Sequence, residues 1–144
     1  MFKKILYPTD FSDVARKALD FIKELKSAGA EEVVILHVID KRFFDAMAWY
    51  TTKDLPEMEK DLRTEVTSEI EPIEKELKDM GFKVKVRIET GNPFTEILRV
   101  EEEENVSGMA IGSHGVSNIK EMFLGSVSEK VIRNAKKPVH VIKR

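Results

Sequence analysis

Cysteine is absent from this chain of 144 residues, which excludes disulfides, thiolate catalysis and zinc–thiolate sites together. Long apolar runs are absent as well, and none approaches the roughly 20 residues that a membrane-spanning helix needs. Neither sign of charge prevails, since the formal net charge is −2. The chain therefore lacks the basic excess that nucleic-acid binding requires. Met1 is not followed by the apolar stretch and cleavage site of a secretory signal. We therefore expect a cytoplasmic protein that binds neither a membrane nor a nucleic acid.

The chain contains enough apolar sequence for a core of its own. Hydrophobic residues make up 42% of it and charged residues 35%, so we expect a single domain over residues 1–144. Five β-branched runs alternate with helical patterns, and each gap exceeds the dozen or so residues that a parallel crossover requires. This alternation predicts an α/β fold with a parallel sheet. The runs are residues 3–7, 32–38, 82–88, 109–111 and 138–142.

The helical patterns carry start and stop signals. Ser12 or Asp10 is placed to cap the first helix, and Asn92 is a cap followed by proline at the first helical position. The second helix has apolar residues at spacings of three and four from Leu62 onward. Pro72 is expected to kink or break that helix, because proline lacks the amide that would bond back along it.

Residues 41–55 form the one long connection without a clear period. Long connections in compact domains are usually functional or mobile, and this one is rich in apolar side chains. Two interpretations stay open: an apolar flap that rests on the core, or a lid or partner surface that orders on binding. The apolar residues are Phe43, Phe44, Met47, Trp49 and Tyr50.

Glycines cluster where the fourth strand is expected to end. Gly112-Ser113-His114-Gly115 is followed, after nine residues, by Gly125-Ser126-Val127-Ser128 at the start of the last helix. The free amides and dipole of a helix N-terminus attract anions, most often phosphate, and serine hydroxyls add further donors. Ligands of open α/β sheets bind at the carboxyl ends of the strands, so Pro8-Thr9-Asp10 is expected beside this loop. Asp10 would then contact the base, the ribose or a metal ion of a nucleotide.

None of these glycines is decisive alone, because glycine is more often part of a turn or a helix cap than of a binding site. The loop is not a P-loop, and the dinucleotide pattern G-x-G-x-x-G is absent too. The combined spacing predicts a phosphate site, and the residues alone do not identify its ligand.

Four segments together resemble those of a known family. Residues 5–12, with the sequence Ile-Leu-Tyr-Pro-Thr-Asp-Phe-Ser, are similar to its opening strand and the turn that follows, and residues 34–38 to its second strand. The glycine loop is similar to its ATP-binding signature, G-x2-G-x9-G-[S/T], at every fixed position. Residues 135–141 are similar to its last strand. The family is that of the universal stress proteins, and the resemblance covers nearly the whole chain.

This resemblance implies an open five-stranded parallel sheet of strand order 3-2-1-4-5 with helices on both faces, similar to half of a Rossmann fold. It implies ATP, or AMP or ADP, as the ligand, with a divalent ion such as Mg²⁺ or Mn²⁺ held mainly by phosphate and water. It also implies a homodimer through the C-terminal strand, residues 138–143. The nucleotide-binding residues that it implies are Pro8, Thr9, Asp10, Val38, Ile111, Gly112, His114, Gly115, Gly125, Ser126, Val127 and Ser128.

The strand before the glycine loop departs from the family pattern, because Gly108 and Ala110 replace larger residues and are expected to weaken it. Of the three histidines, His37 is expected in the core or behind the site, and His114 in contact with the nucleotide. His140 is expected at the dimer edge, where its protonation would make association depend on pH. The acidic run at residues 101–104 is expected to be a solvated helix end.

We expect an ATP-binding stress-response protein whose nucleotide acts as a switch or as a structural ligand of the homodimer. No residue is given a catalytic role, because a serine hydrolase built on Ser126 and His114 would lack a nucleophile elbow and an orienting third group. Slow ATP hydrolysis stays open as an alternative, although no general base is evident. The other alternative is a nucleotide-independent protein-interaction module that uses the 41–55 loop.

Overall fold

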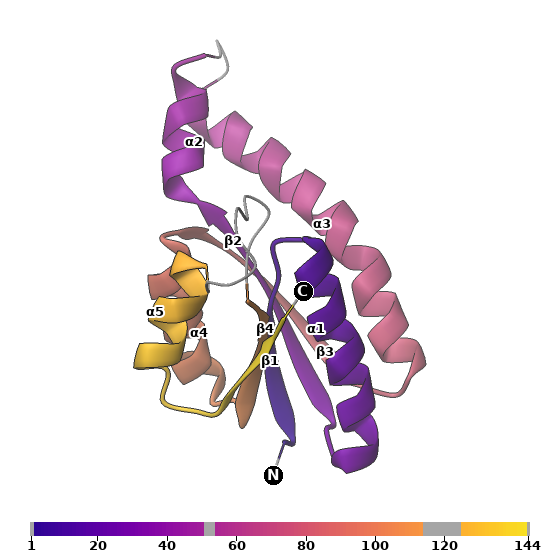
Figure 1. Ribbon diagram of the computed structural model, residues 1–144. Helices are drawn as coiled ribbons and strands as arrows, with labels where there is room; N and C mark the ends of the chain where they lie inside the picture. The colour runs from indigo at the N-terminus through magenta and orange to yellow at the C-terminus, as the bar shows by residue number, and fades with distance from the viewer. Residues whose placement is uncertain (1, 51–53, 114–124, 144) are drawn as a thin grey trace.

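The computed structural model describes residues 2–50, 54–113 and 125–143. Within them, five parallel strands form one sheet of order β3-β2-β1-β4-β5 (Figure 1). This confirms the α/β fold and the strand order 3-2-1-4-5. The strands are β1 (Lys4–Pro8), β2 (Glu32–Asp40), β3 (Lys83–Gly91), β4 (Gly108–Gly112) and β5 (Val139–Ile142).

Helices cover both faces of the sheet. On one face lie α1 (Asp13–Glu24), continued by the short 3-10 helix η1 (Leu25–Ala28), and α3 (Leu55–Asp79). On the other lie α4 (Pro93–Glu104) and α5 (Ser126–Asn134). A further helix, α2 (Lys41–Ala48), follows the carboxyl end of β2. In Figure 1, α2 and the start of α3 extend together beyond that end of the sheet.

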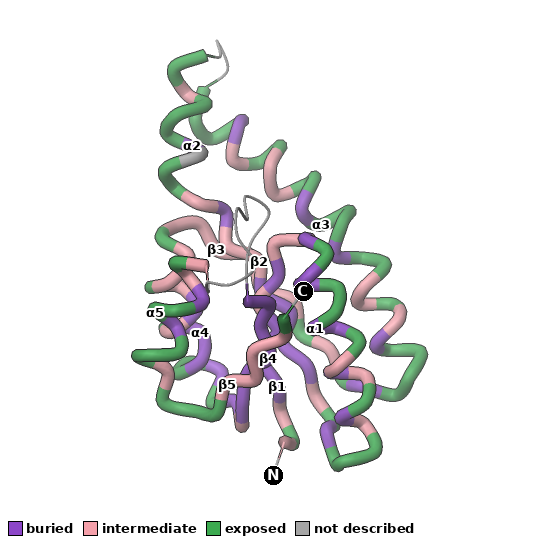
Figure 2. Tube along the Cα trace, viewed as in Figure 1, coloured by how far each residue is buried: buried purple, intermediate pink, exposed green. Residues whose placement is uncertain are grey.

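Each face of the sheet has its own hydrophobic cluster, because side chains alternate along a strand. Ile5 and Tyr7 of β1 belong to the cluster under α1 and α3, and Leu6 between them belongs to the cluster under α4 and α5. Burial is therefore greatest in the central strands and falls toward the outer helix faces, as Figure 2 shows. β2 is buried on both faces, and β3 forms the half-exposed edge that its alternating sequence predicts.

The expected helix signals are confirmed at two N-termini. The Ser12 hydroxyl accepts a hydrogen bond from the amide of Ala15 at 3.2 Å, and the Asn92 side chain accepts one from the amide of Thr95 at 3.1 Å. The expectation of a break at Pro72 is wrong, because α3 is a continuous helix of 25 residues that contains this proline.

The expectation of an irregular connection is also wrong for residues 41–48. Asp40 caps α2 by accepting the amide of Arg42 at 2.9 Å, so residues 41–48 are helical. Phe44 is buried, whereas Trp49 and Tyr50 after the helix are 87% and 92% exposed. The interpretation as a flap on the core therefore holds for Phe44 and fails for the two following aromatics.

The acidic run at the end of α4 is not simply solvated. Glu101 is buried and accepts the backbone amides of Lys136 and Lys137 at 3.1 and 3.3 Å, which fixes the turn before β5. Glu104 is buried too, and its carboxylate contacts three cations of the neighbouring strands. These are Lys4 at 3.4 Å, Lys85 at 2.8 Å and Arg87 at 3.1 Å. Only Glu102 and Glu103 are exposed as expected.

Among the helices of the described residues, none combines the length and the apolar character needed to cross a membrane.

Candidate functional site

The candidate site lies where the carboxyl ends of β1 and β4 separate. Their ladder contains two residue pairs, the second of which joins Leu6 to Met109, whereas β4 stays paired with β5 as far as Gly112. β1 continues instead beside β2, and the amide of Thr9 donates to the carbonyl of Leu36 at 2.8 Å. Because the strand order reverses between β1 and β4, this is the crevice in which open α/β sheets bind ligands.

The turn after β1 supplies the polar groups of one wall. The Thr9 hydroxyl accepts the amide of Phe11 at 3.0 Å, and a carboxylate oxygen of Asp10 accepts the amide of Ser12 at 3.0 Å. These side chains therefore fold the turn tightly onto itself before Ser12 begins α1. Phe11 has a φ of 65°, the left-handed conformation that bulky residues seldom adopt.

His37 of β2 lies behind this turn. Its Nδ1 is 2.8 Å from the carbonyl oxygen of Thr9, and its ring stacks on Phe11 with centroids 4.8 Å apart. Burial lowers the pKa of His37, with the bond to the Thr9 carbonyl opposing this shift, so the ring is neutral at neutral pH. The next residue, Val38, is half-buried at the same end of β2 and packs against the cluster under α4 and α5.

The end of β4 packs directly on α1. A Cβ atom added to Gly112 would lie 2.5 Å from Cγ1 of Val14, so only glycine fits there. This close approach of two elements explains Gly112 without any ligand. The Ser128 hydroxyl of α5 donates to the carbonyl of Gly112 at 2.8 Å. This hydrogen bond joins α5 to β4. The hydroxyl proton of Ser128 is therefore used within the protein, whereas the sequence suggested that it would bond to phosphate.

The two ends of the glycine loop are joined by the backbone. Ser113 donates its amide to the carbonyl of Ile142 at 2.8 Å, and the amide of Gly125 donates to the carbonyl of Ser113 at 2.8 Å. Gly125 is the N-cap of α5, in an extended conformation and without a side chain that could cap the helix. The first turn of α5 thus starts at the crevice with the positive end of its dipole.

The structure brings most of the predicted site residues to one edge of the sheet, at the ends of β1, β2 and β4 and the start of α5. Ile111 is at this edge, and its side chain belongs to the buried cluster under α4 and α5. His114 and Gly115 lie outside the described residues. The predicted residues at this edge are Pro8, Thr9, Asp10, Val38, Ile111, Gly112, Gly125, Ser126, Val127 and Ser128.

Phe11 was not expected from the sequence to be part of a site. It stacks on His37, for which the sequence predicts a place in the core or behind the site. The available signal was the position of His37 at the end of a buried strand, next to Val38. The left-handed backbone of Phe11 had no signal, because the residue type argues against it.

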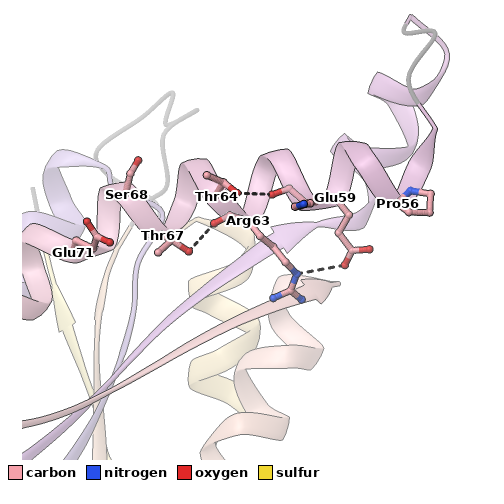
Figure 3. A pocket seen from close by; sticks show the side chains of 8 residues that line it. Pro56, Glu59, Arg63, Thr64, Thr67, Ser68 and Glu71 are labelled. Carbon is pink, nitrogen blue, oxygen red and sulfur yellow. Dashed lines mark hydrogen bonds and ion pairs between the residues drawn. The ribbon is translucent and has the colours of Figure 1, made fainter.

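A separate groove runs along the outer side of α3 (Figure 3). Its lining comes from this one helix. Two of its hydroxyls are used within the helix, since Thr64 donates to the carbonyl of Lys60 at 2.9 Å and Thr67 to that of Arg63 at 2.7 Å. Arg63 and Glu59 pair at 3.5 Å. The groove therefore offers few uncommitted polar groups and is not the candidate site.

The described residues contain no cluster of three or more His, Asp or Glu side chains that could hold a metal ion. Asp10, in the turn after β1, is the one acidic residue of the predicted binding set, and its carboxylate accepts the amide of Ser12. A divalent ion at this edge would therefore need most of its ligands from a bound phosphate and from water.

A sequence profile of the universal stress protein family matches residues 1–143. The universal stress protein MJ0577 of Methanocaldococcus jannaschii is 46% identical over an alignment that covers 100% of this chain and 96% of that protein. The universal stress protein YxiE of Bacillus subtilis is 30% identical and covers 99% of this chain and 100% of its own.

Solved structures match the chain as well. The structure of hypothetical protein MJ0577 matches with a TM-score of 0.90 at 47% identity, over 100% of this chain and 97% of that one. A universal stress protein in complex with cAMP matches with a TM-score of 0.71 at 18% identity, over 99% of this chain and 97% of that one. A family protein from Arabidopsis thaliana with AMP bound matches with 0.69 at 19% identity, over 99% and 92%. The likeness to the last two is one of fold.

Proposed function

The chain belongs to the universal stress protein family, and we propose that it binds an adenine nucleotide, ATP in the first instance, at the carboxyl ends of β1 and β4. The observation that carries this proposal is the start of α5 at that edge. Gly125 caps the helix without a side chain, and its amide is bonded to Ser113, so the first turn of the helix is fixed beside the ends of the strands. A helix N-terminus in this position is suited to a phosphate group.

The phosphates would lie on the amides of Ser126, Val127 and Ser128. The exposed Ser126 would also offer its hydroxyl, whereas Ser128 contributes its backbone alone, because its hydroxyl bonds Gly112. Thr9 and Asp10 would face the ribose and the base, with Val38 beside the adenine through its backbone. Pro8, Ile111, Gly112, His114 and Gly115 complete the proposed binding set. A Mg²⁺ or Mn²⁺ ion would accompany the phosphates.

Two relatives in the fold were solved with AMP or cAMP bound, which supports an adenine nucleotide as the class of ligand. In this chain the nucleotide would act as a switch or as a structural ligand of a homodimer. The dimer would form through residues 138–143, since β5 is an edge strand of the sheet. On that strand His140 packs against Phe2 and Phe21, and its buried Nε2 has no hydrogen-bond partner within the described structure.

The test is to denature the purified protein, measure released nucleotide by ion-exchange chromatography, and titrate the nucleotide-free protein with ATP and Mg²⁺ by calorimetry. Gly125→Val would place a side chain at the cap and should abolish binding. Lys130→Ala, an exposed position of the same helix, is the matched control and should bind as the wild type. Absence of both copurified nucleotide and heat in the wild type would contradict the proposal. Accumulation of ADP or AMP would favour the slow hydrolase.

A nucleotide-independent interaction module is the second candidate, and one observation favours it. Trp49 and Tyr50 are almost fully exposed after α2, and Met47 and Leu55 nearby are partly exposed. Exposed aromatics of this kind are typical of protein-interaction surfaces. Trp49→Ser in a pull-down would distinguish the two candidates, because it should leave ATP binding unchanged and remove a partner captured through this surface.

A further inference from the structure

The turn after β1 is held in a conformation that its residue type disfavours. Phe11 adopts the left-handed region at a φ of 65°, and no glycine is present in the segment from Pro8 to Ser12 to relieve it. Backbone strain of this kind persists only where the surroundings over-determine it, and it gathers at functional sites. The surroundings here are specific: the amide of Phe11 donates to the Thr9 hydroxyl, and the amide of Ser12 donates to the Asp10 carboxylate.

A neighbouring strand holds the same turn from behind. The Phe11 ring lies on His37 at a centroid distance of 4.8 Å and an interplanar angle of 21°. Nδ1 of His37 is 2.8 Å from the Thr9 carbonyl oxygen. Because a carbonyl oxygen only accepts hydrogen bonds, Nδ1 carries the proton and Nε2 of the neutral ring is left as an acceptor. His37 thus contacts the turn twice, once through the ring face and once through Nδ1.

Asp10 lies between these two contacts along the chain. Thr9 before it is fixed by the hydrogen bond from His37, and Phe11 after it is fixed by the stack. The Asp10 carboxylate is therefore carried by a backbone whose two sides are both held from β2. A group fixed in its binding geometry loses less conformational entropy when the ligand arrives, and so it binds more tightly.

We propose that Phe11 and His37 are positioning residues of the nucleotide site, which set Thr9 and Asp10 for the ribose and base before the nucleotide binds. This inference rests on the proposed function and adds to it a strained turn held from the neighbouring strand. It gives Phe11 a reason for its conformation, because the left-handed backbone accompanies the placement of its ring over His37.

Three variants separate the two contacts. His37→Phe keeps an aromatic ring under Phe11 and removes the Nδ1 donor, and Phe11→Gly removes the stack while it relieves the backbone strain. Phe11→Tyr keeps the ring and serves as the conservative rescue. The matched control is Val106→Ala, a buried position at the opposite end of the sheet, which should weaken folding without touching the turn.

The measurements are ATP affinity by calorimetry with Mg²⁺, and the free energy of unfolding in urea for the same proteins. We expect His37→Phe and Phe11→Gly each to weaken ATP binding by about tenfold or more, with Phe11→Tyr close to the wild type. Val106→Ala should retain wild-type affinity despite its lower stability. Wild-type affinity in both His37→Phe and Phe11→Gly would overturn the inference while the proposed function stands. A wild type that does not bind ATP would overturn both.

A spectroscopic readout tests the hydrogen bond directly. Nitrogen-15 shifts of the His37 ring should show the Nδ1-protonated tautomer in the nucleotide-free protein, before ATP is added. The same tautomer should persist in Phe11→Tyr. A ring protonated on Nε2 alone in the free protein would contradict a turn positioned in advance.

Discussion

A Cβ atom added to Gly112 would meet Cγ1 of Val14 at 2.5 Å and the Val14 carbonyl carbon at 3.2 Å. The carboxyl end of β4 therefore rests on the first turn of α1 with no space for a side chain. Gly112→Ala is expected to destabilise the protein by about 1–3 kcal/mol, because Val14 and its backbone must shift. Urea unfolding at equilibrium measures the effect.

The control for this prediction is the double variant. Val14→Ala alone should cost about 2 kcal/mol, because it removes buried methyl groups. In Gly112→Ala/Val14→Ala the new methyl group occupies part of the space that is vacated, so the double variant should lose less stability than the sum of the two single losses. Strict additivity would show that the two residues do not contact each other.

Glu104 is expected to stabilise the packing of α4 on the sheet. Its buried carboxylate pairs with Lys85, Arg87 and Lys4, so removal of the charge leaves these cations without their common partner. Glu104→Gln should lower the free energy of unfolding by about 1–2 kcal/mol. Glu102→Gln is the control on the same helix, and because its side chain is exposed it should change stability by less than about 0.5 kcal/mol.

The pH dependence of stability should show two separate ranges. Burial lowers the pKa of His37 from its usual 6.5, so the unfolded chain takes up this proton at a higher pH than the native protein does. Stability is therefore lost as pH falls below about 6.5 toward the native pKa of His37. The pKa of Glu104 is lowered from 4.5, chiefly by the hydrogen bond from Lys85, so its contribution is lost only below about 4.5.

Urea unfolding at a series of pH values measures both ranges. The loss that begins near pH 6.5 should disappear in His37→Asn, which has no titrating ring, whereas the loss below about pH 4.5 should remain. If the free energy of unfolding of His37→Asn still falls below about pH 6.5 as steeply as that of the wild type, another group takes up the proton.

The single tryptophan should report a water-exposed surface. Trp49 is 87% exposed, so its fluorescence emission should resemble that of free indole in water and should be readily quenched by acrylamide. Trp49→Ser should change the free energy of unfolding by less than about 0.5 kcal/mol. A blue-shifted, protected emission in the purified protein would instead indicate that another chain covers this surface.

The proposed dimer can be tested through the outer edge of β5. Pro138 and Ile142 accept amides of β4 and the residue that follows it, so by alternation the backbone groups of Val139 and Val141 face outward. Val141→Pro should reduce the sedimenting mass from twice the monomer mass to the monomer mass and leave the sheet intact. Lys75→Ala, at an exposed position of α3 outside residues 138–143, is the control. A monomeric wild type would contradict the proposed dimer.

Much of the fold was predictable because local patterns and burial agree. The almost continuous apolar run of β2, interrupted by His37, indicated a strand covered on both faces, and the alternation along β3 indicated an edge. Ser12 and Asn92 marked helix starts, because their side chains act on amides only three residues away. The position of the candidate site is a prediction from the parallel topology, which places all carboxyl ends of the strands at one edge.

The errors concern contacts between distant residues. The sequence predicts a solvated Glu101, because the amides that donate to its carboxylate belong to residues 136 and 137, far along the chain. The packing of Gly112 on Val14 could not be read from the glycine loop, because Val14 lies far earlier in the chain. Helix α2 was missed because it is short and the wider 41–55 segment has no sustained period, although Asp40 is a capping residue before it and Phe44 and Met47 are three residues apart, as on one face of a helix.

The short ladder between β1 and β4 has a consequence for the order in which the molecule folds. The contacts that join β4 to β1 connect residues far apart in the sequence. The amide of Lys4, for example, donates to the hydroxyl of Ser107, which lies 103 residues further along the chain. Closing so long a loop costs conformational entropy, and only two residue pairs are gained in return, so this step is expected to be slow. The strands β1, β2 and β3 follow one another at shorter separations along the chain. We expect the β1–β4 seam to close last. A newly synthesised chain would then pair β1, β2 and β3 first. The crevice between β1 and β4 would form last, and with it the ability to bind a ligand there.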